Sequence, residues 1–541
     1  MDDTTTASDG EYSGPTEVID IAPDGDVILD VTFDTSKKTL LAAKKAAAAV
    51  KPVRPRAGQT KEQQNAQPSP PPPPPPVPKP RVRKGFRVQI SVLKAHSKYF
   101  SNLLSDSRFA EAKSITAAFE RLSLLKTKPS DADAKDLPLI KIHEDDEATH
   151  YAGQDRVFED LLRLLHTKKL SSPGAGGPVT LHYLATFAVL ADRFDCTAFV
   201  SAHMKVGEAM GRKWPLTQPR RTMTTTTAGG GDDGAAALSF ASEETLRQKI
   251  LVTWLLEEPL KFQAATRELI LYGSRRWSRF ALEDDEESSS SQADSDDDQK
   301  YKAAWWHLPD GLESELQHRR DCILRTVASV PSFFLRLYMP ASRSSTTNLQ
   351  CRRGYDSSPS CDSYQLGEAV RFLVNKQLFF LVNFSGDQGL DEAMARTNGY
   401  ATATDVNHVI SVLRQLPSYQ IDKNHLNCGL RLRVLPILDF IQSSLSSGAV
   451  AVSRTGWKRD PEGSSWVVST EGEEEQVLNH HRGARWDSGG GGGGRKSARV
   501  FVYDHSMAGD QRLRFEGSLE AGSKVRALFT ADQWVWASGE S

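Results

Sequence analysis

Residues 86–104 read FRVQISVLKAHSKYFSNLL, and this stretch decides the fold of the first part of the chain. Phe86, Val88 and Ile90 alternate with Arg87 and Gln89, as in a half-buried strand. The apolar residues that follow recur at helical spacing: Val92, Leu93, Tyr99, Phe100, Leu103 and Leu104. The polar pair His96-Ser97 is placed to cap the part of the helix that carries the aromatics. We therefore expect a strand that leads directly into an amphipathic helix.

Related patterns lie on both sides of this stretch. Residues 26–33 (DVILDVTF) and 137–143 (LPLIKIH) alternate apolar and polar side chains and predict two more strands. Residues 157–165, 180–191 and 194–204 carry apolar stripes at helical spacing, with Thr180 placed as a cap. The predicted order is strand, strand-helix, strand and three helices. We expect the strands near positions 27 and 88 to lie side by side, covered by the helices.

This order of elements resembles the BTB/POZ domain, and several short motifs add to the resemblance. They are Asp26-Val27-x-Leu29-x-Val31, the stretch Phe86–Leu104, an aromatic-x-Glu turn at Phe109–Glu111, and the segment Leu184–Cys196, which resembles the family's Ala-Asp-aromatic-x-Cys helix. BTB proteins of filamentous fungi, with proline-rich insertions and a long downstream region, are most similar in layout. The chain departs from the family at Gln89, where a His is common, and in its insertion at 37–83.

The resemblance implies an α+β domain over residues 24–212, with a small sheet covered by stacked helices. It implies self-association, for instance as a homodimer, and recruitment of protein partners. In one version the domain is an adaptor for a cullin-type ubiquitin ligase, and Phe109 and Glu111 contact the scaffold. The alternative is a nuclear transcriptional or chromatin regulator that uses the domain to dimerise.

Composition predicts folded segments separated by disordered ones. Over 541 residues the hydrophobic share is 39%, the net charge is −2 and the mean hydropathy is −0.45. We expect disorder at 1–23, in the proline-rich insertion 37–83, in a second insertion at 112–136, and in the acidic segment 281–300. A linker at 213–239 leads to a mostly helical region at 240–445. The fold of 446–541, which includes the β-prone runs 465–468 and 500–503, does not follow from its pattern.

The totals also bear on location and partners. The N-terminus lacks a signal-peptide pattern, apolar runs of membrane-spanning length are absent, and five cysteines do not make a disulfide framework. We expect an intracellular protein, cytoplasmic or nuclear, that binds neither membrane nor nucleic acid directly. No familiar catalytic motif is present, so we expect no enzymatic activity.

One set of residues suggests a metal site. Cys351, Cys361, His425 and Cys428 supply the thiolates and imidazole that a structural zinc site uses, and His-x-x-Cys places two ligands within one turn. Such an ion would tie a Ser/Arg-rich loop to the turn at 424–429. The alternative is that these cysteines are unpaired, since a ten-residue spacing between the first two is not a familiar zinc-finger pattern.

Overall fold

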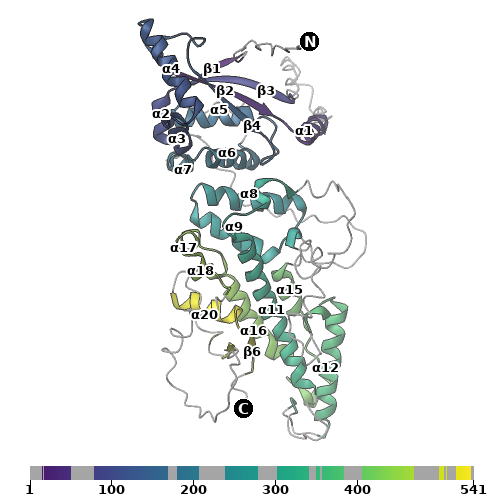
Figure 1. Ribbon diagram of the computed structural model, residues 1–541. Helices are drawn as coiled ribbons and strands as arrows, with labels where there is room; N and C mark the ends of the chain where they lie inside the picture. Colours follow the sequence, from purple (N-terminus) through teal and green to yellow (C-terminus); the bar gives the residue numbers. More distant parts are fainter. Residues whose placement is uncertain are drawn as a thin grey trace, which may run out of the picture. The chain divides into compact units, whose positions relative to one another are not determined.

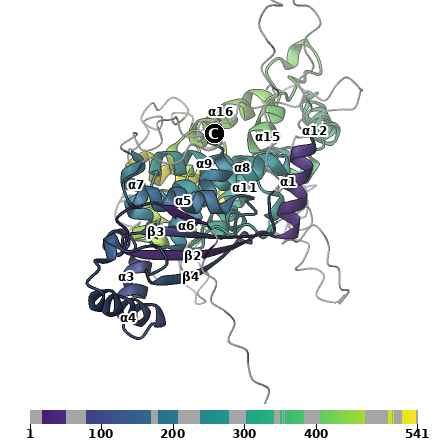
Figure 2. The ribbon, with the colours of Figure 1, turned by 90° about the horizontal axis from the view of Figure 1, so that it is seen from above.

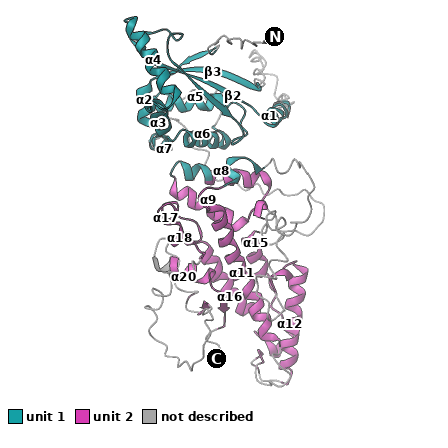
Figure 3. Cartoon of the chain, viewed as in Figure 1, with its two compact units in different colours: residues 1–219, 251–257, 294–307 teal, residues 220–250, 258–293, 308–541 magenta. Residues whose placement is uncertain are grey.

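The computed structural model describes residues 15, 17–49, 78–168, 179–205, 238–277, 301–339, 349–351, 353, 356–382, 405–467, 499–504, 507 and 519–537. The chain forms two compact units (Figure 3). Unit 1 comprises residues 1–219, 251–257 and 294–307, and unit 2 comprises 220–250, 258–293 and 308–541. Unit 1 therefore includes two segments beyond the predicted domain at 24–212. The predicted disordered segment 281–300 lies outside the described residues.

Unit 1 is built on a four-stranded mixed sheet with the order β1-β3-β2-β4 (Figure 1). The strands are β1 (Val18–Asp20), β2 (Val27–Asp34), β3 (Arg81–Val88) and β4 (Leu139–Asp145). β2 and β3 are antiparallel, with Val27 opposite Val88 and Asp34 opposite Arg81. β4 runs parallel to β2, and β1 runs parallel to β3. The predicted pairing of the strands near positions 27 and 88 is confirmed.

Helices pack on the apolar face of this sheet. They are α2 (Ile90–His96), α3 (Lys98–Ser105), α5 (Gln154–Leu165), α6 (Leu181–Arg193) and α7 (Thr197–Lys205). Phe158 of α5 is fully buried, with its ring 5.7 Å from that of Phe33 and 5.5 Å from that of Phe86. Ser97 and Thr180 cap α3 and α6, since their hydroxyls accept the backbone N–H of Phe100 and Tyr183, both at 3.1 Å. Both predicted caps are confirmed.

The prediction that residues 112–136 form a disordered insertion is wrong. It contains most of α4 (Ala110–Leu124) and the short η2 (Pro129–Asp131). Ala112, Ile115, Ala118 and Leu122 recur at helical spacing and are buried. Leu122 packs with Ile28, Ala132 and Leu137 on the sheet face away from α5. The high content of charged and small residues concealed this narrow apolar stripe.

Three further boundaries differ from the prediction. α1 (Lys37–Ala49) and the first residues of β3 occupy both ends of the segment predicted as the 37–83 insertion, and residues 50–77 are outside the described part. β1 lies in the segment predicted as a disordered N-terminus. Ile90 begins a helix instead of ending a strand, because its N–H donates to the Asp26 carboxylate at 2.8 Å. Viewed from above, α1 and α4 lie at opposite ends of the sheet (Figure 2).

Most of the described residues within 240–445 lie in helices, as predicted for this region. Its helices are α8 (Phe240–Leu255), α9 (Pro259–Tyr272), α11 (Leu312–Tyr338), α12 (Ser358–Asn375), α15 (Val406–Leu413) and α16 (Arg431–Leu445), with short 3-10 turns η4 (Ala304–Trp306), η5 (Phe379–Leu381) and η6 (Lys423–His425). α11 is the central helix of unit 2 and contacts α9, α12 and α16. Among the described residues no single helix is long and apolar enough to span a membrane. α16 and the following segment Gly448–Arg459 reach that length and apolar composition only together, and a bend of 68° separates them.

The C-terminal region packs on α11. It contains η7 (Gly448–Val450), α17 (Arg454–Arg459), α18 (Pro461–Ser464), α20 (Leu519–Phe529), and the parallel pair β5 (Val500–Val502) and β6 (Gln533–Val535). The buried Arg319 of α11 donates to the carbonyls of Val450, Ala451 and Ser464 and pairs with Glu315. The run at 500–503 thus contributes a strand, whereas residues 465–467 are irregular.

Candidate metal centre

The structure brings Cys351, Cys361, His425 and Cys428 together within unit 2. Their four ligand atoms all lie within 4.8 Å of one another. The Cys351 Sγ is 3.3 Å from the His425 Nδ1 and 3.7 Å from the Cys428 Sγ. The Cys428 Sγ is 4.0 Å from the His425 Nδ1. This cluster of three thiols and one imidazole could hold a metal ion.

The first two cysteines are positioned by the start of α12. Cys361 lies in the first turn of this helix, where its N–H donates to the Ser357 carbonyl at 2.9 Å. The neighbouring Asp362 carboxylate accepts the backbone N–H groups of Gln350 and Cys351, at 2.8 and 2.9 Å. Asp362 therefore fixes the loop that carries Cys351 against the helix that carries Cys361.

The other two ligands come from a tight turn. The Asp422 carboxylate accepts the N–H of Asn424 at 2.7 Å and that of His425 at 3.2 Å, which caps η6. Asn427 then adopts a left-handed conformation, with φ of 66°, and reverses the chain so that Cys428 returns toward His425. Asn is one of the few residues with a side chain that tolerates this conformation readily.

The orientation of the imidazole is set from outside the cluster. The His425 Nε2 lies 2.8 Å from the Ser357 hydroxyl, so the opposite ring nitrogen, Nδ1, faces the sulfur atoms. Metal-binding histidines in proteins are commonly held by a hydrogen bond at the second nitrogen. Sequence reasoning missed Ser357 and Asp362. The only signal was the short run of Asp, Ser and Pro at 356–360, before Cys361, which is typical of a helix start.

Burial and charge within the cluster are uneven. Cys361 is 0% exposed, His425 1% and Cys351 4%, whereas Cys428 is half-buried. Burial acts to raise the pKa of Cys351, but hydrogen bonds from Ser358, the Arg353 backbone, His425 and Cys428 lower this pKa to about 7. Burial and then the charge of Cys351 raise the pKa of Cys361 to about 12. Burial, then the hydrogen bond with Cys351 and the charge of Cys351, raise the pKa of Cys428. The protein groups alone thus favour one thiolate among the three thiols, and a bound dication would favour ionisation of the others.

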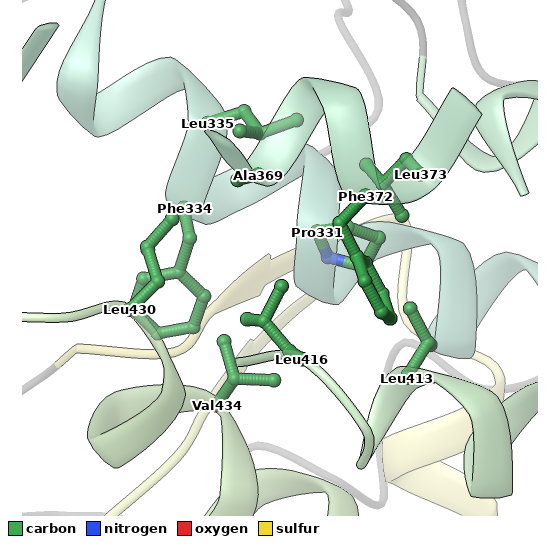
Figure 4. Close-up of a pocket in the computed structure, with 10 residues that line it drawn as sticks. All are labelled: Pro331, Phe334, Leu335, Ala369, Phe372, Leu373, Leu413, Leu416, Leu430 and Val434. Carbon is green, nitrogen blue, oxygen red and sulfur yellow. The ribbon is translucent and has the colours of Figure 1, made fainter. Parts of the chain in front are cut away.

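Two cavities in the described residues differ from this centre. In unit 2, a cavity of about 30 Å³ has an entirely apolar lining that includes Pro331, Phe334 and Phe372 (Figure 4). It has room for roughly one or two water molecules and lacks polar partners for them, so it is a packing defect of the core. On the sheet of unit 1, a hollow of about 470 Å³ has charged walls, but Arg83 and Arg81 there are paired with Asp30 and Asp34.

The predicted partner-binding residues lie in unit 1. Phe109 precedes α4 and is 41% exposed, and Glu111 lies in the first turn of α4. Tyr99 of α3 is also partly exposed, at 38%. Burial raises the pKa of Tyr99, and the carboxylates of Glu144 and, more weakly, Glu111 add to this effect. Glu111 and Tyr99 are therefore close enough to interact electrostatically.

The chain was compared with family models, curated proteins and solved structures, and none of them matches it.

Proposed function

We propose that this protein acts by binding other proteins through a BTB/POZ-like unit 1, and that unit 2 is stabilised by a structural Zn²⁺ ion. The observation that carries the first part is the ladder between β2 and β3. Asp34 and Arg81 are 47 positions apart, yet their strands pair over eight residues and continue into β4. This pairing, with α5 and its neighbouring helices on one face of the sheet and α4 on the other, supports the resemblance to BTB/POZ domains.

The proposed partner surface surrounds the start of α4. Tyr99 and Phe109 expose aromatic rings there, and aromatic side chains with a nearby charge are typical of protein interfaces. Glu111 supplies the charge. The partner is either a second copy of the chain or a cullin-type scaffold, and the two are separable by experiment.

A pull-down of a cullin scaffold by the full chain tests the adaptor role. Glu111→Lys is expected to weaken binding at least tenfold, because it reverses the charge beside the two aromatics. Glu120→Lys is the matched control on an exposed position of the same helix and is expected to bind normally. No binding by the wild type, or equal loss in both variants, would remove the adaptor role. Light scattering over a range of concentrations tests self-association; a strict monomer would remove that part.

The geometry of the metal centre favours zinc in a closed site. With Zn–S bonds of about 2.3 Å, tetrahedral geometry places two sulfur atoms about 3.8 Å apart. The 3.7 Å between the Cys351 and Cys428 sulfurs is close to this value. Four protein ligands leave no open position for a substrate, so the ion would be structural. Soft thiolates also disfavour Mg²⁺ and Ca²⁺.

The metal content of the purified full chain tests this proposal. We expect about one zinc ion per chain, from the four-ligand set found in the described residues. Cys361→Ser is expected to lose the zinc. Cys322→Ser, which changes a buried cysteine of α11 outside the cluster, is expected to retain it. A zinc-free wild type, or zinc retained by Cys361→Ser, would contradict the proposal.

A further inference from the structure

The four residues of the metal centre are not equally accessible. Cys428 alone among them is half-buried, whereas Cys351, Cys361 and His425 are at most 4% exposed. The turn around Cys428 lies at the surface, because Asp422, Lys423, Asn424, Leu426 and Asn427 are all exposed. Cys428 is therefore the residue of the cluster that is most accessible to a small molecule from solvent.

Cys351 is placed to react with an oxidised Cys428. Their sulfur atoms are 3.7 Å apart, and a disulfide needs about 2 Å, so the gap to close is less than about 2 Å. Cys351 lies in an irregular loop, whereas Cys361 is fixed in the first turn of α12. The loop and the exposed turn can approach each other more easily than the helix can move.

We propose that Cys428 is a site of oxidation by peroxides, and that its oxidation releases the zinc by forming a Cys351–Cys428 disulfide. This inference rests on the zinc centre proposed above. It adds a modification site and a means of regulation to a centre that is otherwise structural.

The chemistry balances with hydrogen peroxide as the oxidant. The Cys428 thiolate attacks one peroxide oxygen, the O–O bond breaks, and hydroxide leaves, which gives a sulfenic acid. The Cys351 thiolate then attacks the Cys428 Sγ, the S–O bond breaks, and a second hydroxide leaves as the S–S bond forms. The two sulfurs lose two electrons to the peroxide, and two protons convert the hydroxides to water. Only Cys361 and His425 remain as ligands, and the Zn²⁺ is released without change of oxidation state.

The test uses the zinc-loaded full chain and hydrogen peroxide. Zinc content is measured first, so a zinc-free protein identifies failure of the zinc proposal before any oxidant is added. Released zinc is then followed with a chromophoric chelator, and disulfides are mapped by peptide mass spectrometry without reduction. We expect one zinc ion released for each Cys351–Cys428 disulfide, with recovery after addition of a thiol reductant and zinc.

Two variants and one labelling experiment make the result decisive. Cys428→His keeps four ligands but removes the sulfur of the most accessible residue, so zinc release is expected to slow at least tenfold. Cys322→Ser is expected to release zinc at the wild-type rate. If Cys428→His does not bind zinc, brief alkylation of the wild type replaces it, with Cys428 expected to be modified first among the three. Zinc retained in peroxide, a different disulfide, or first modification at Cys351 or Cys361 would overturn the inference.

Discussion

The sheet of unit 1 and the candidate metal centre of unit 2 hold distant parts of the chain together in different ways. Each joins segments that are far apart in the sequence, at positions 34 and 81 in the first case and 351 and 425 in the second. The sheet does so with a continuous hydrogen-bond ladder above an aromatic core around Phe158. The candidate metal centre would do so with four side chains around one ion, and hydrogen bonds to Asp362 and Asp422 also fix the loop and the turn that carry them.

The difference determines how each region should fail. Loss of one contact in a ladder leaves the others in place, whereas loss of one ligand from the proposed zinc site would remove the ion and all the links that it would make. The sheet is therefore expected to weaken by degrees, and the metal centre to be lost as a whole. The following experiments separate these two behaviours.

Metal removal should give the largest effect. Structural zinc in small domains contributes about 10 kcal/mol or more, so chelation is expected to cost unit 2 at least about 4 kcal/mol locally. Hydrogen exchange with mass spectrometry should show faster exchange at residues 349–362 and 419–434. Exchange in β2 and α5 should not change. Equal acceleration in both units would mean that the ion does not act locally, and no change anywhere would contradict a stabilising metal.

Truncation of the aromatic core of unit 1 should give the second-largest effect on stability. Phe158 is fully buried against Phe33, Phe86 and Phe194, so Phe158→Ala is expected to lower the free energy of unfolding by about 3 to 5 kcal/mol. Urea unfolding measures this change, and zinc content should stay normal. Phe109→Ala is the control, because Phe109 is 41% exposed, and it should lower the free energy of unfolding by less than about 1 kcal/mol. Similar costs for the two variants would contradict the assigned core.

Glu144, one of several buried carboxyl groups of unit 1, should make the stability of this unit sensitive to pH. Burial raises the pKa of Glu144 to about 7, against the opposing effect of Arg193 at 3.1 Å. The folded state therefore holds a proton that the unfolded state releases near pH 4.5, and stability falls as pH rises from about 4.5 to about 7. The expected loss is up to about 3 kcal/mol.

Urea unfolding at pH 5 and pH 7.5 measures this dependence. Glu144→Gln cannot ionise and should reduce the difference between the two pH values. A wild type that is more stable at pH 7.5 than Glu144→Gln, or two proteins with the same pH dependence, would contradict the assignment.

The ion pairs between β2 and β3 should give the smallest effects. Asp30 is 3% exposed, and its carboxylate accepts hydrogen bonds from the Nε and Nη2 of Arg83, at 2.8 and 2.6 Å. Asp30→Asn is expected to cost about 1 to 2 kcal/mol, because Arg83 is itself partly exposed. Asp34→Asn, whose partner Arg81 is 69% exposed, should cost less than about 0.5 kcal/mol. The reverse order would contradict the role of burial in these pairs.

Local pattern predicted β2, β3, β4 and most helices, but not β1, because period and chain order together restrict the fold. The strand at 26–33, the stretch 86–104 and the caps Ser97 and Thr180 follow from alternation, helical spacing and capping chemistry. α4 did not, because its apolar stripe consists of single small or branched residues among charges, and its burial depends on the distant Ile28 and Leu137. Likewise Ile90 is placed in a helix by the distant Asp26.

The ligand residues of the candidate metal centre were predictable from the sequence, but the contacts that hold these residues in place were not. Three thiols and a His in one region suggested the ligand set, and the structure brings those four residues together. Ser357 and Asp362 act across the fold, through the His425 ring and the backbone of Cys351, and no spacing in the sequence predicts such contacts. The left-handed turn at Asn427 was visible only as an Asn between two ligands.

X-ray absorption at the zinc edge of the purified full chain observes the proposed Zn²⁺ site itself. We expect a shell of three sulfur atoms at about 2.3 Å and one nitrogen at about 2.0 Å, with no bound water. A shell of oxygen and nitrogen alone, or fewer than three sulfurs in the wild type, would contradict it.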